Sequence, residues 1–345
     1  MTLPEFWFLL IGFMFASYFM LEGFDFGVGA LLPVLGKDDV GRRVMINTIG
    51  PVWDANETWL VLAAGAMFAA FPSWYATAFS AAYLPLLIIL GTLIARGLAF
   101  EFRGKKDDAQ WRRQWDRCIV TGSTVVPVLW GLFFANLVRG LPIDDRGDYA
   151  GGVLDLFSPY TVLGGLVVLS MFATHGAIFL TLKTSGGIRH DARELGTRLA
   201  VVTVLLSAAF LGWTIASHGD PRSATLAIAV VAGTVGAAVA NARGRDGVAF
   251  FLTAGAVVLL VTTYFSLLYP NVMPSTTDPA NNLTIANASS SPYTLTLMSW
   301  VAVLVVPFVL AYQAWSYWVF RKRLSRDHIP LIPQHGAAAG GNRST

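Results

Sequence analysis

The 345-residue chain is 55% hydrophobic and only 13% charged, with a formal net charge of +3. A soluble domain of this length does not need so apolar a composition, so the balance predicts a protein embedded in lipid. The basic residues lie in short segments between apolar runs, which argues against nucleic-acid binding. The single cysteine, Cys118, excludes an internal disulfide and an all-cysteine metal site.

Nine apolar segments are long enough to cross a bilayer, which takes about 20 residues of helix. They cover residues 4–34, 50–70, 76–100, 118–138, 159–182, 199–217, 223–242, 248–269 and 293–320. The first segment follows Met1 without a basic region, so we interpret it as a retained span and not as a signal peptide. We expect an all-α integral membrane protein with two four-helix bundles and one peripheral helix, in one domain over residues 1–329. The tail, 330–345, is predicted to be disordered.

Basic residues distinguish the two sides of the membrane. With the N-terminus outside, 20 of the 24 Lys and Arg residues fall on the cytoplasmic side, whereas Arg139, Arg146 and Arg222 fall outside and Arg96 lies within a span. Lys and Arg are in excess in the cytoplasmic loops of membrane proteins. The sequence therefore predicts an external N-terminus and a cytoplasmic C-terminus.

Acidic residues lie inside the first two spans, where an ionised carboxylate costs at least a few kcal/mol. Glu22 and Asp25 are three residues apart in the first span, and Asp54 and Glu57 repeat that spacing in the second. Residues three apart share one face of a helix, so the two acidic faces can meet. At about 1.5 Å per residue, we place Asp25 about 15 Å from the inner end of its helix and Asp54 about 6 to 8 Å from the inner end of its own.

Two roles are open for these acids. Asp54, Asp25 and Glu57 are candidates for a path that carries protons, or another cation, from the cytoplasm partway into the membrane. In the structural alternative, some of the acids pair with Arg96, Asn56 or backbone groups and hold the helices in register.

Other polar residues in the spans suggest structural roles. Arg96, Glu101 and Arg103 predict a salt-bridge cluster at the inner end of the third span, although snorkelling would also explain Arg96. His175 is the only histidine well inside a span, so a haem with two axial histidines cannot be built from this chain alone. We group His175 with the structural polar residues, and a single-histidine haem or one metal ligand is the alternative.

Aromatic and glycine residues of the first two spans carry two further predictions. Trp53 lies at a predicted interface, where tryptophan commonly anchors a helix, and its alternative role is contact with a quinone ring or with a haem edge of a partner. The glycines Gly23, Gly27 and Gly29 are predicted to let a neighbouring helix approach closely.

The same motifs closely resemble subunit II of the cytochrome bd-type quinol oxidases of bacterial respiratory membranes. Most of the likeness lies in the first 140 residues, and the motifs follow in the order and spacing of the family. The matching stretches are Glu22-Gly-Phe-Asp25-Phe-Gly-Val-Gly29, Arg42-Arg-Val-Met-Ile-Asn47, Pro51-Val-Trp-Asp54-Ala-Asn56-Glu57-Thr-Trp59, Phe68-Ala-Ala-Phe71-Pro72, Arg96-Gly-Leu-Ala-Phe-Glu101-Phe-Arg103 and His175-Gly-Ala with Lys183-Thr184.

The resemblance implies one part of a larger enzyme in the bacterial inner membrane. In this family subunit I carries two haems b and one haem d and oxidises quinol, whereas subunit II has nine helices and ligates no haem. The pair reduces O2 to water in aerobic respiration and takes protons from the cytoplasm. The resemblance thus implies a heterodimer with subunit I, contacts with lipid and quinone, and neither a catalytic residue nor a metal site in this chain. A small accessory subunit is an open alternative.

The resemblance also implies roles for particular residues. The aspartate matching Asp54 is implicated in delivering protons toward haem d, and the one matching Asp25 lies in the same helix-pair environment. Some members bind a quinone near the tryptophan matching Trp53. Glu57 stands where the family pattern has Gln, and so adds an acid to this region.

A proton-coupled secondary transporter is the contrasting hypothesis, with Asp25, Asp54 and Glu57 binding the coupling ion. Such transporters commonly have broken helices in two corresponding halves, whereas only the first half of this chain has polar interruptions. The pattern therefore favours the oxidase subunit. A purely structural membrane scaffold is a third hypothesis.

Overall fold

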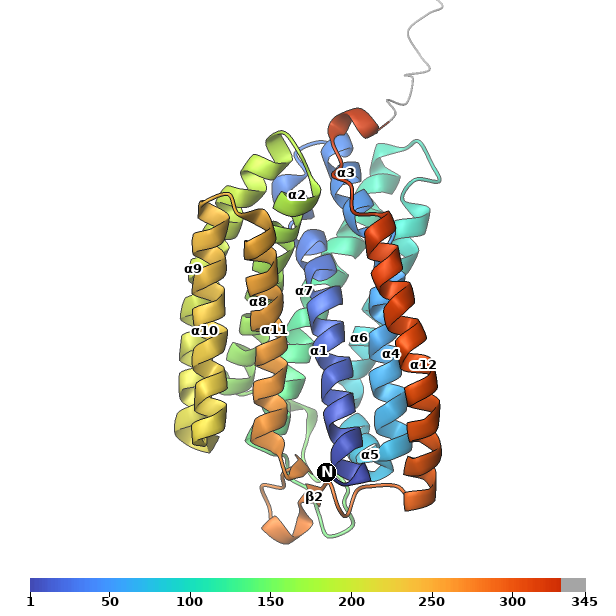
Figure 1. The fold of residues 1–345 in the computed structure, drawn as a ribbon, viewed down its shortest axis with the longest axis vertical. Helices are drawn as coiled ribbons and strands as arrows, with labels where there is room; N and C mark the ends of the chain where they lie inside the picture. Colours follow the sequence, from blue (N-terminus) through green and yellow to red (C-terminus); the bar gives the residue numbers. More distant parts are fainter. Residues whose placement is uncertain (330–345) are drawn as a thin grey trace, which may run out of the picture.

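The computed structural model describes residues 1–329, which form a bundle of long helices running roughly parallel to one another (Figure 1). The long helices are α1 (Leu3–Ala30), α4 (Trp53–Ala70), α6 (Tyr83–Phe102), α7 (Ala109–Arg139), α8 (Pro159–Lys183), α9 (Gly187–His218), α10 (Pro221–Ala242), α11 (Asp246–Leu268) and α12 (Pro292–Val319). The shorter ones are α2 (Leu32–Leu35), α3 (Asp39–Ile49) and α5 (Pro72–Ala81), with 3-10 turns at Val153–Leu156, Pro279–Asn281 and Arg326–His328. The predicted all-α membrane class is confirmed. The tail predicted to be disordered, 330–345, lies outside the described residues.

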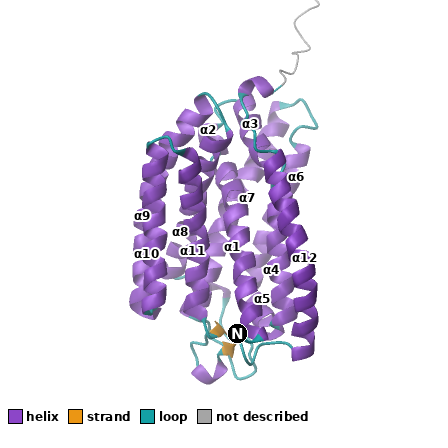
Figure 2. Ribbon diagram, in the orientation of Figure 1, coloured by secondary structure: helices purple, strands orange, loops and turns teal. Residues whose placement is uncertain are grey.

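Two strands complete the described part of the chain. β1 (Asn271–Met273) and β2 (Leu283–Thr284) pair antiparallel in the loops at the end of the bundle where the N-terminus lies (Figure 2). Side chains tie these loops to the helix ends: Ser290 donates to the carbonyl of Ala69, and Thr77 donates to that of Gly147. The N-terminal end of the bundle is thus covered by hydrogen-bonded loops.

The long helices pack in two groups of four. Helices α1, α4, α6 and α7 form one group and α8 to α11 form the other, and α1 packs against α8 and α11 across the boundary. Helix α12 lies outside both groups and has its main, limited contacts with α1 and α4. Of its most apolar stretch only 6% is buried in this chain. The arrangement agrees with the predicted two bundles and one peripheral helix.

Eight helices within residues 1–329 are long and apolar enough to cross a membrane. Helix α4 is not among them, because Asp54, Asn56 and Glu57 lower the mean hydropathy of its 18 residues. The predicted count of nine spans therefore stays a prediction that depends on α4.

Two helix boundaries differ from the prediction, and a proline explains each difference. The first span was expected to reach residue 34, but α1 ends at Ala30, since Pro33 has no N–H with which to continue the helix. The third span, expected from 76 to 100, is divided between α5 and α6, where Pro85 likewise lacks the N–H that would bond back to Ala81. As a result, Asp25 lies about 7.5 Å from the C-terminal end of α1, half the distance predicted.

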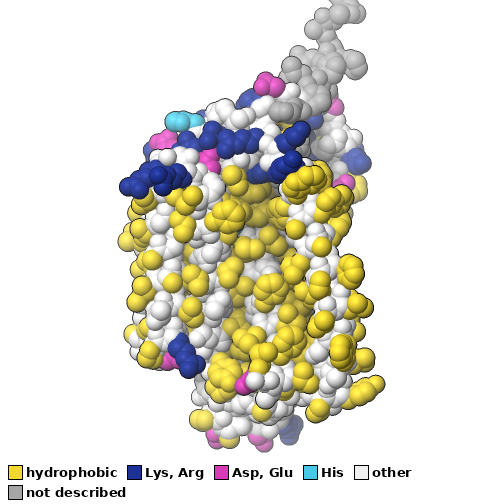
Figure 3. Space-filling view, viewed as in Figure 1, with side chains coloured by type: hydrophobic (Ala, Val, Ile, Leu, Met, Phe, Trp, Pro, Cys, Tyr) yellow, Lys and Arg dark blue, Asp and Glu magenta, His cyan; other side chains and the backbone are white. Residues whose placement is uncertain are grey.

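Charged side chains mark one end of the bundle. Lys and Arg gather at the end away from the N-terminus, while hydrophobic side chains cover the sides of the helices (Figure 3). This distribution is the one expected if the basic end faces the cytoplasm. The orientation itself stays a prediction.

Glycines hold α1 close to its neighbours, as the sequence predicted. A Cβ atom on Gly27 would lie 2.0 Å from the carbonyl oxygen of Phe172 and 2.8 Å from the Cα of Gly176, both on α8. A Cβ on Gly29 would lie 2.0 Å from the Ser123 hydroxyl on α7. Backbone meets backbone at the Gly27–Gly176 crossing, so neither side can move aside to admit a side chain.

We expect Gly27→Ala to destabilise the protein by about 1–3 kcal/mol or more, because the added methyl group overpacks this crossing. Gly212→Ala is the matched control, since Gly212 is a helical glycine around which an added Cβ would meet no atom within 4 Å. The melting temperature of each purified variant measures the difference. Equal stability of the two variants would contradict the close crossing.

Candidate functional site

A buried ion pair joins α1 to α6. Nη1 of Arg96 donates to Oε1 of Glu22, and their side chains are 1% and 0% exposed. The guanidinium also lies over two aromatic rings, with its Cζ 4.5 Å from the centre of Phe26 and 5.1 Å from that of Phe100. Arg96 therefore points into the protein interior, and the snorkelling alternative does not describe it.

Asn56 connects three helices beside this pair. Its Nδ2 donates to Oδ2 of Asp25 at 2.7 Å, and its Oδ1 accepts from Gln313 and from the Tyr317 hydroxyl, each at 2.7 Å. Asp25 and Asn56 are fully buried. The carboxamide of α4 thus links the acid of α1 to the otherwise loosely attached α12.

The remaining predicted acids lie where α4 begins. Asp54, in the first turn of α4, is exposed in this chain, and Glu57, one turn further on, is half-buried. Glu57 is near enough to Arg96 to interact with it electrostatically, as are Glu22 and Asp25. The structure therefore brings Glu22, Asp25 and Glu57 around one guanidinium, with Asp54 at the edge of the group.

Trp53 lies half-buried beside Asp54 and packs on α6. Its ring centre is 5.2 Å from that of Phe100, and Gly97 leaves room for the ring. One face of the indole thus has a protein partner.

The expected polar cluster of Arg96, Glu101, Arg103 and His175 is not one cluster. Arg103 pairs instead with Asp116 (2.5 Å) and Asp39 (2.8 Å) at the basic end of the bundle, and Glu101 is exposed. Arg103, which caps the C-terminus of α6, lies two turns beyond Arg96 and points to different partners.

His175 occupies a separate position between α8, α1 and α11. Its Nε2 donates to the carbonyl of Met20 at 3.2 Å, so in the neutral ring Nδ1 accepts from the Thr253 hydroxyl at 2.7 Å. The ring also stacks on Phe250. Both nitrogens already have protein partners, so the geometry does not present His175 to a haem iron or another metal. Within residues 1–329, no group of three or more His, Cys, Asp or Glu side chains is arranged to hold a metal ion.

Sequence reasoning missed two members of the site, Gln313 and Tyr317. A signal was present, because Gln313 is the only amide side chain in the apolar stretch that forms α12. Buried polar side chains are normally hydrogen-bonded, so an amide there already indicated a polar partner on another helix.

Comparison with known proteins assigns the family. The sequence model of the cytochrome bd terminal oxidase subunit II family matches residues 3–320. The chain belongs to this family. It is therefore a multi-pass protein of the bacterial inner membrane.

Relatives match nearly the whole chain. It is 43% identical over 329 residues to the cytochrome bd ubiquinol oxidase subunit 2 of Bacillus subtilis, covering 94% of this chain and 97% of the relative. It is 34% identical over 361 residues to the cytochrome bd-I ubiquinol oxidase subunit 2 of Escherichia coli K12, covering 94% and 95%. A chain in the structure of bd oxidase from Geobacillus thermodenitrificans superposes with a TM-score of 0.76 at 18% identity, covering 93% of this chain and all of that one. This last likeness shows the same fold.

We expect Glu22→Met or Arg96→Met alone to destabilise the protein by about 3–5 kcal/mol, because each removes one partner of a buried ion pair. The double variant, with both residues replaced by Met, is expected to recover most of the loss. Melting temperatures and yields of the purified proteins measure this. Single variants as stable as the unmodified chain would contradict a structural ion pair.

Proposed function

We propose that this chain is the second subunit of a quinol-oxidising terminal oxidase that reduces O2 to water in aerobic respiration. Two findings support the proposal: the family model matches residues 3–320, and the relatives are subunits of ubiquinol oxidases. The haems, two of type b and one of type d, would lie in partner subunit I. The hydrogen bonds that engage both nitrogens of His175 support a chain that ligates no haem itself.

The partner would cover the side of the bundle formed by α6, α4 and α12. This side exposes large apolar side chains, among them Leu90 on α6 and Trp300 and Phe308 on α12, which are 56%, 72% and 71% exposed. A partner docked on this side would lie beside Asp54 in the first turn of α4, where the proposed proton path begins.

The buried acids would give protons access to that partner. Glu22, Asp25 and Glu57 carry three carboxyl groups around the single positive charge of Arg96. If all three were ionised, the interior would keep a net charge of −2, which is costly to bury. A neutral cluster would hold two protons. Asp54, exposed at the basic end of the bundle, would take protons from the cytoplasm and pass them toward Glu57 and Asp25.

Other predictions stay open in this proposal. A quinone contact at Trp53 would use the indole face that Phe100 does not cover. A small accessory subunit is compatible with the largely uncovered α12. Family membership does not favour the proton-coupled transporter.

We expect Asp54→Asn to leave the complex assembled but to slow quinol oxidase turnover at least about tenfold, because an amide cannot relay a proton as a carboxyl does. Asp54→Glu should restore most of the rate. Asp145→Asn, in an exposed loop at the opposite end, is the control and should leave the rate unchanged. Oxygen consumption with added quinol, normalised to haem content, measures turnover. A correctly assembled Asp54→Asn complex with the unmodified rate would contradict the proton role.

We expect Gly91→Trp on α6 to reduce the amount of haem-bearing partner that co-purifies with the chain several-fold. A Cβ on Gly91 meets no atom of this chain within 4 Å, so the indole would project from the proposed partner surface. Gly212→Trp on α9, which has equally open surroundings, is the matched control. Haem content per tagged chain measures assembly. Equal haem content in both variants would place the partner elsewhere.

A further inference from the structure

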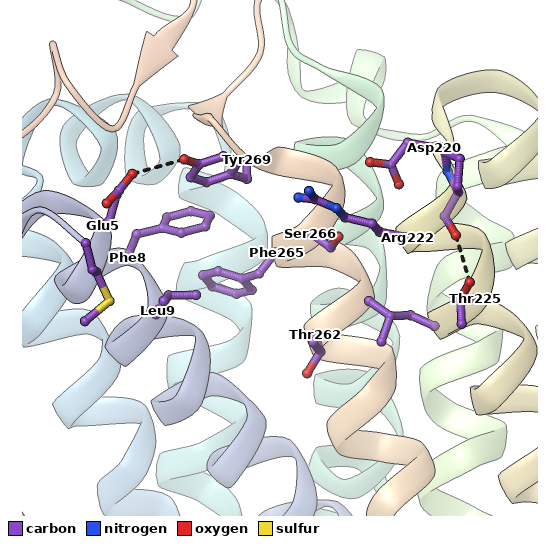
Figure 4. Close-up of a pocket in the computed structure, with 13 residues that line it drawn as sticks. Glu5, Phe8, Leu9, Asp220, Arg222, Thr225, Thr262, Phe265, Ser266 and Tyr269 are labelled. Atoms are coloured by element: carbon purple, nitrogen blue, oxygen red, sulfur yellow. Dashed lines mark hydrogen bonds between the residues drawn. The ribbon is translucent and has the colours of Figure 1, made fainter.

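A groove of about 810 Å³ lies between α1, α10 and α11 at the N-terminal end of the bundle. Its walls are largely apolar and include Leu226 of α10. Leu9 of α1 and Phe265 of α11 line the same groove (Figure 4). Thr262, about two turns from the end of α11, lines its deeper part. The groove therefore runs from the helix ends into the depth where acyl chains lie. It is separate from the acidic cluster and does not depend on the proposed function.

Charges of both signs stand at the rim of this groove. Arg222, at the start of α10, projects between Tyr269 and Asp220 (Figure 4). Among the described residues, no ion pair or hydrogen bond engages its guanidinium. Glu5 faces it from α1 and accepts a hydrogen bond from the Tyr269 hydroxyl at 3.1 Å.

Asp220 adds a second carboxylate at the rim. It caps α10 by accepting from the backbone N–H of Ser223 at 2.7 Å, and this bond lowers the pKa of Asp220 below its ordinary value. Asp220 is therefore negatively charged at neutral pH. A ligand bound at this rim would therefore contact the guanidinium of Arg222 and the carboxylates of Glu5 and Asp220 on either side of it.

We propose that this groove binds a phospholipid whose headgroup carries a primary ammonium, of the phosphatidylethanolamine class. The phosphate would lie on Arg222, since guanidinium and phosphate form strong charge-assisted hydrogen bonds. The ammonium would donate to Asp220 or Glu5, and one acyl chain would lie along Leu9, Phe265 and Thr262. A purely anionic headgroup would leave the two carboxylates unmatched. A neutral quinone ring would match neither charge.

Native mass spectrometry of the purified complex tests this proposal. The complex is placed in nanodiscs that contain phosphatidylethanolamine, phosphatidylcholine and phosphatidylglycerol. The unmodified complex should retain one ethanolamine lipid in preference to the other two. Choline has no N–H to donate, and glycerol carries no positive charge. Arg222→Gln should weaken retention roughly tenfold through loss of the charge-assisted contact.

Two further variants separate lipid binding from a general effect on folding. Thr262→Trp leaves the rim charges intact but fills the deeper groove, so it should also abolish selective retention. Arg146→Gln, which removes an exposed arginine from another loop at the same end, should retain the lipid normally. Equal retention of all three lipids, retention of a quinone in place of a lipid, or unchanged retention in both groove variants would overturn the proposal.

Discussion

The buried pair of Arg96 and Glu22 is the interaction on which the polar interior depends. Both side chains lie in a membrane helix bundle, where neither charge is tolerable without the other. The pair fixes α6 against α1 and places one positive charge among three carboxyl groups. Without that guanidinium, the carboxyl groups of the cluster would have to stay protonated to remain buried.

Close packing of α1 makes this arrangement possible. Gly27 and Gly29 bring α1 against α8 and α7, so the acids of α1 face α4 and α6 at a fixed depth. Asn56 then extends the network to α12 through Gln313 and Tyr317. Asp54 and most of α12 remain uncovered, which is consistent with a subunit that buries them only in a complex.

The sequence predicted which polar residues form the site better than it predicted which of them contact one another. Hydropathy and the acidic residues predicted a helical membrane protein, and glycine spacing predicted the close approach of α1. Two kinds of partner were open for Arg96, namely Glu101 on its own helix and the acids of the first two spans, and the structure pairs it with Glu22 of α1. Neither this long-range pairing nor the meeting of Gln313 with Asn56 follows from local patterns, because both depend on how separate helices pack. The helix ends near Pro33 and Pro85 could have been predicted from the sequence, because proline lacks the N–H that continues a helix.

The most direct test of the account is to purify a tagged form of this chain from its own membranes in mild detergent and to record its reduced-minus-oxidised spectrum. We expect haem b signals with a far-red haem d band, and one large membrane protein that co-purifies with the chain. A colourless chain that is stable without a partner would contradict it.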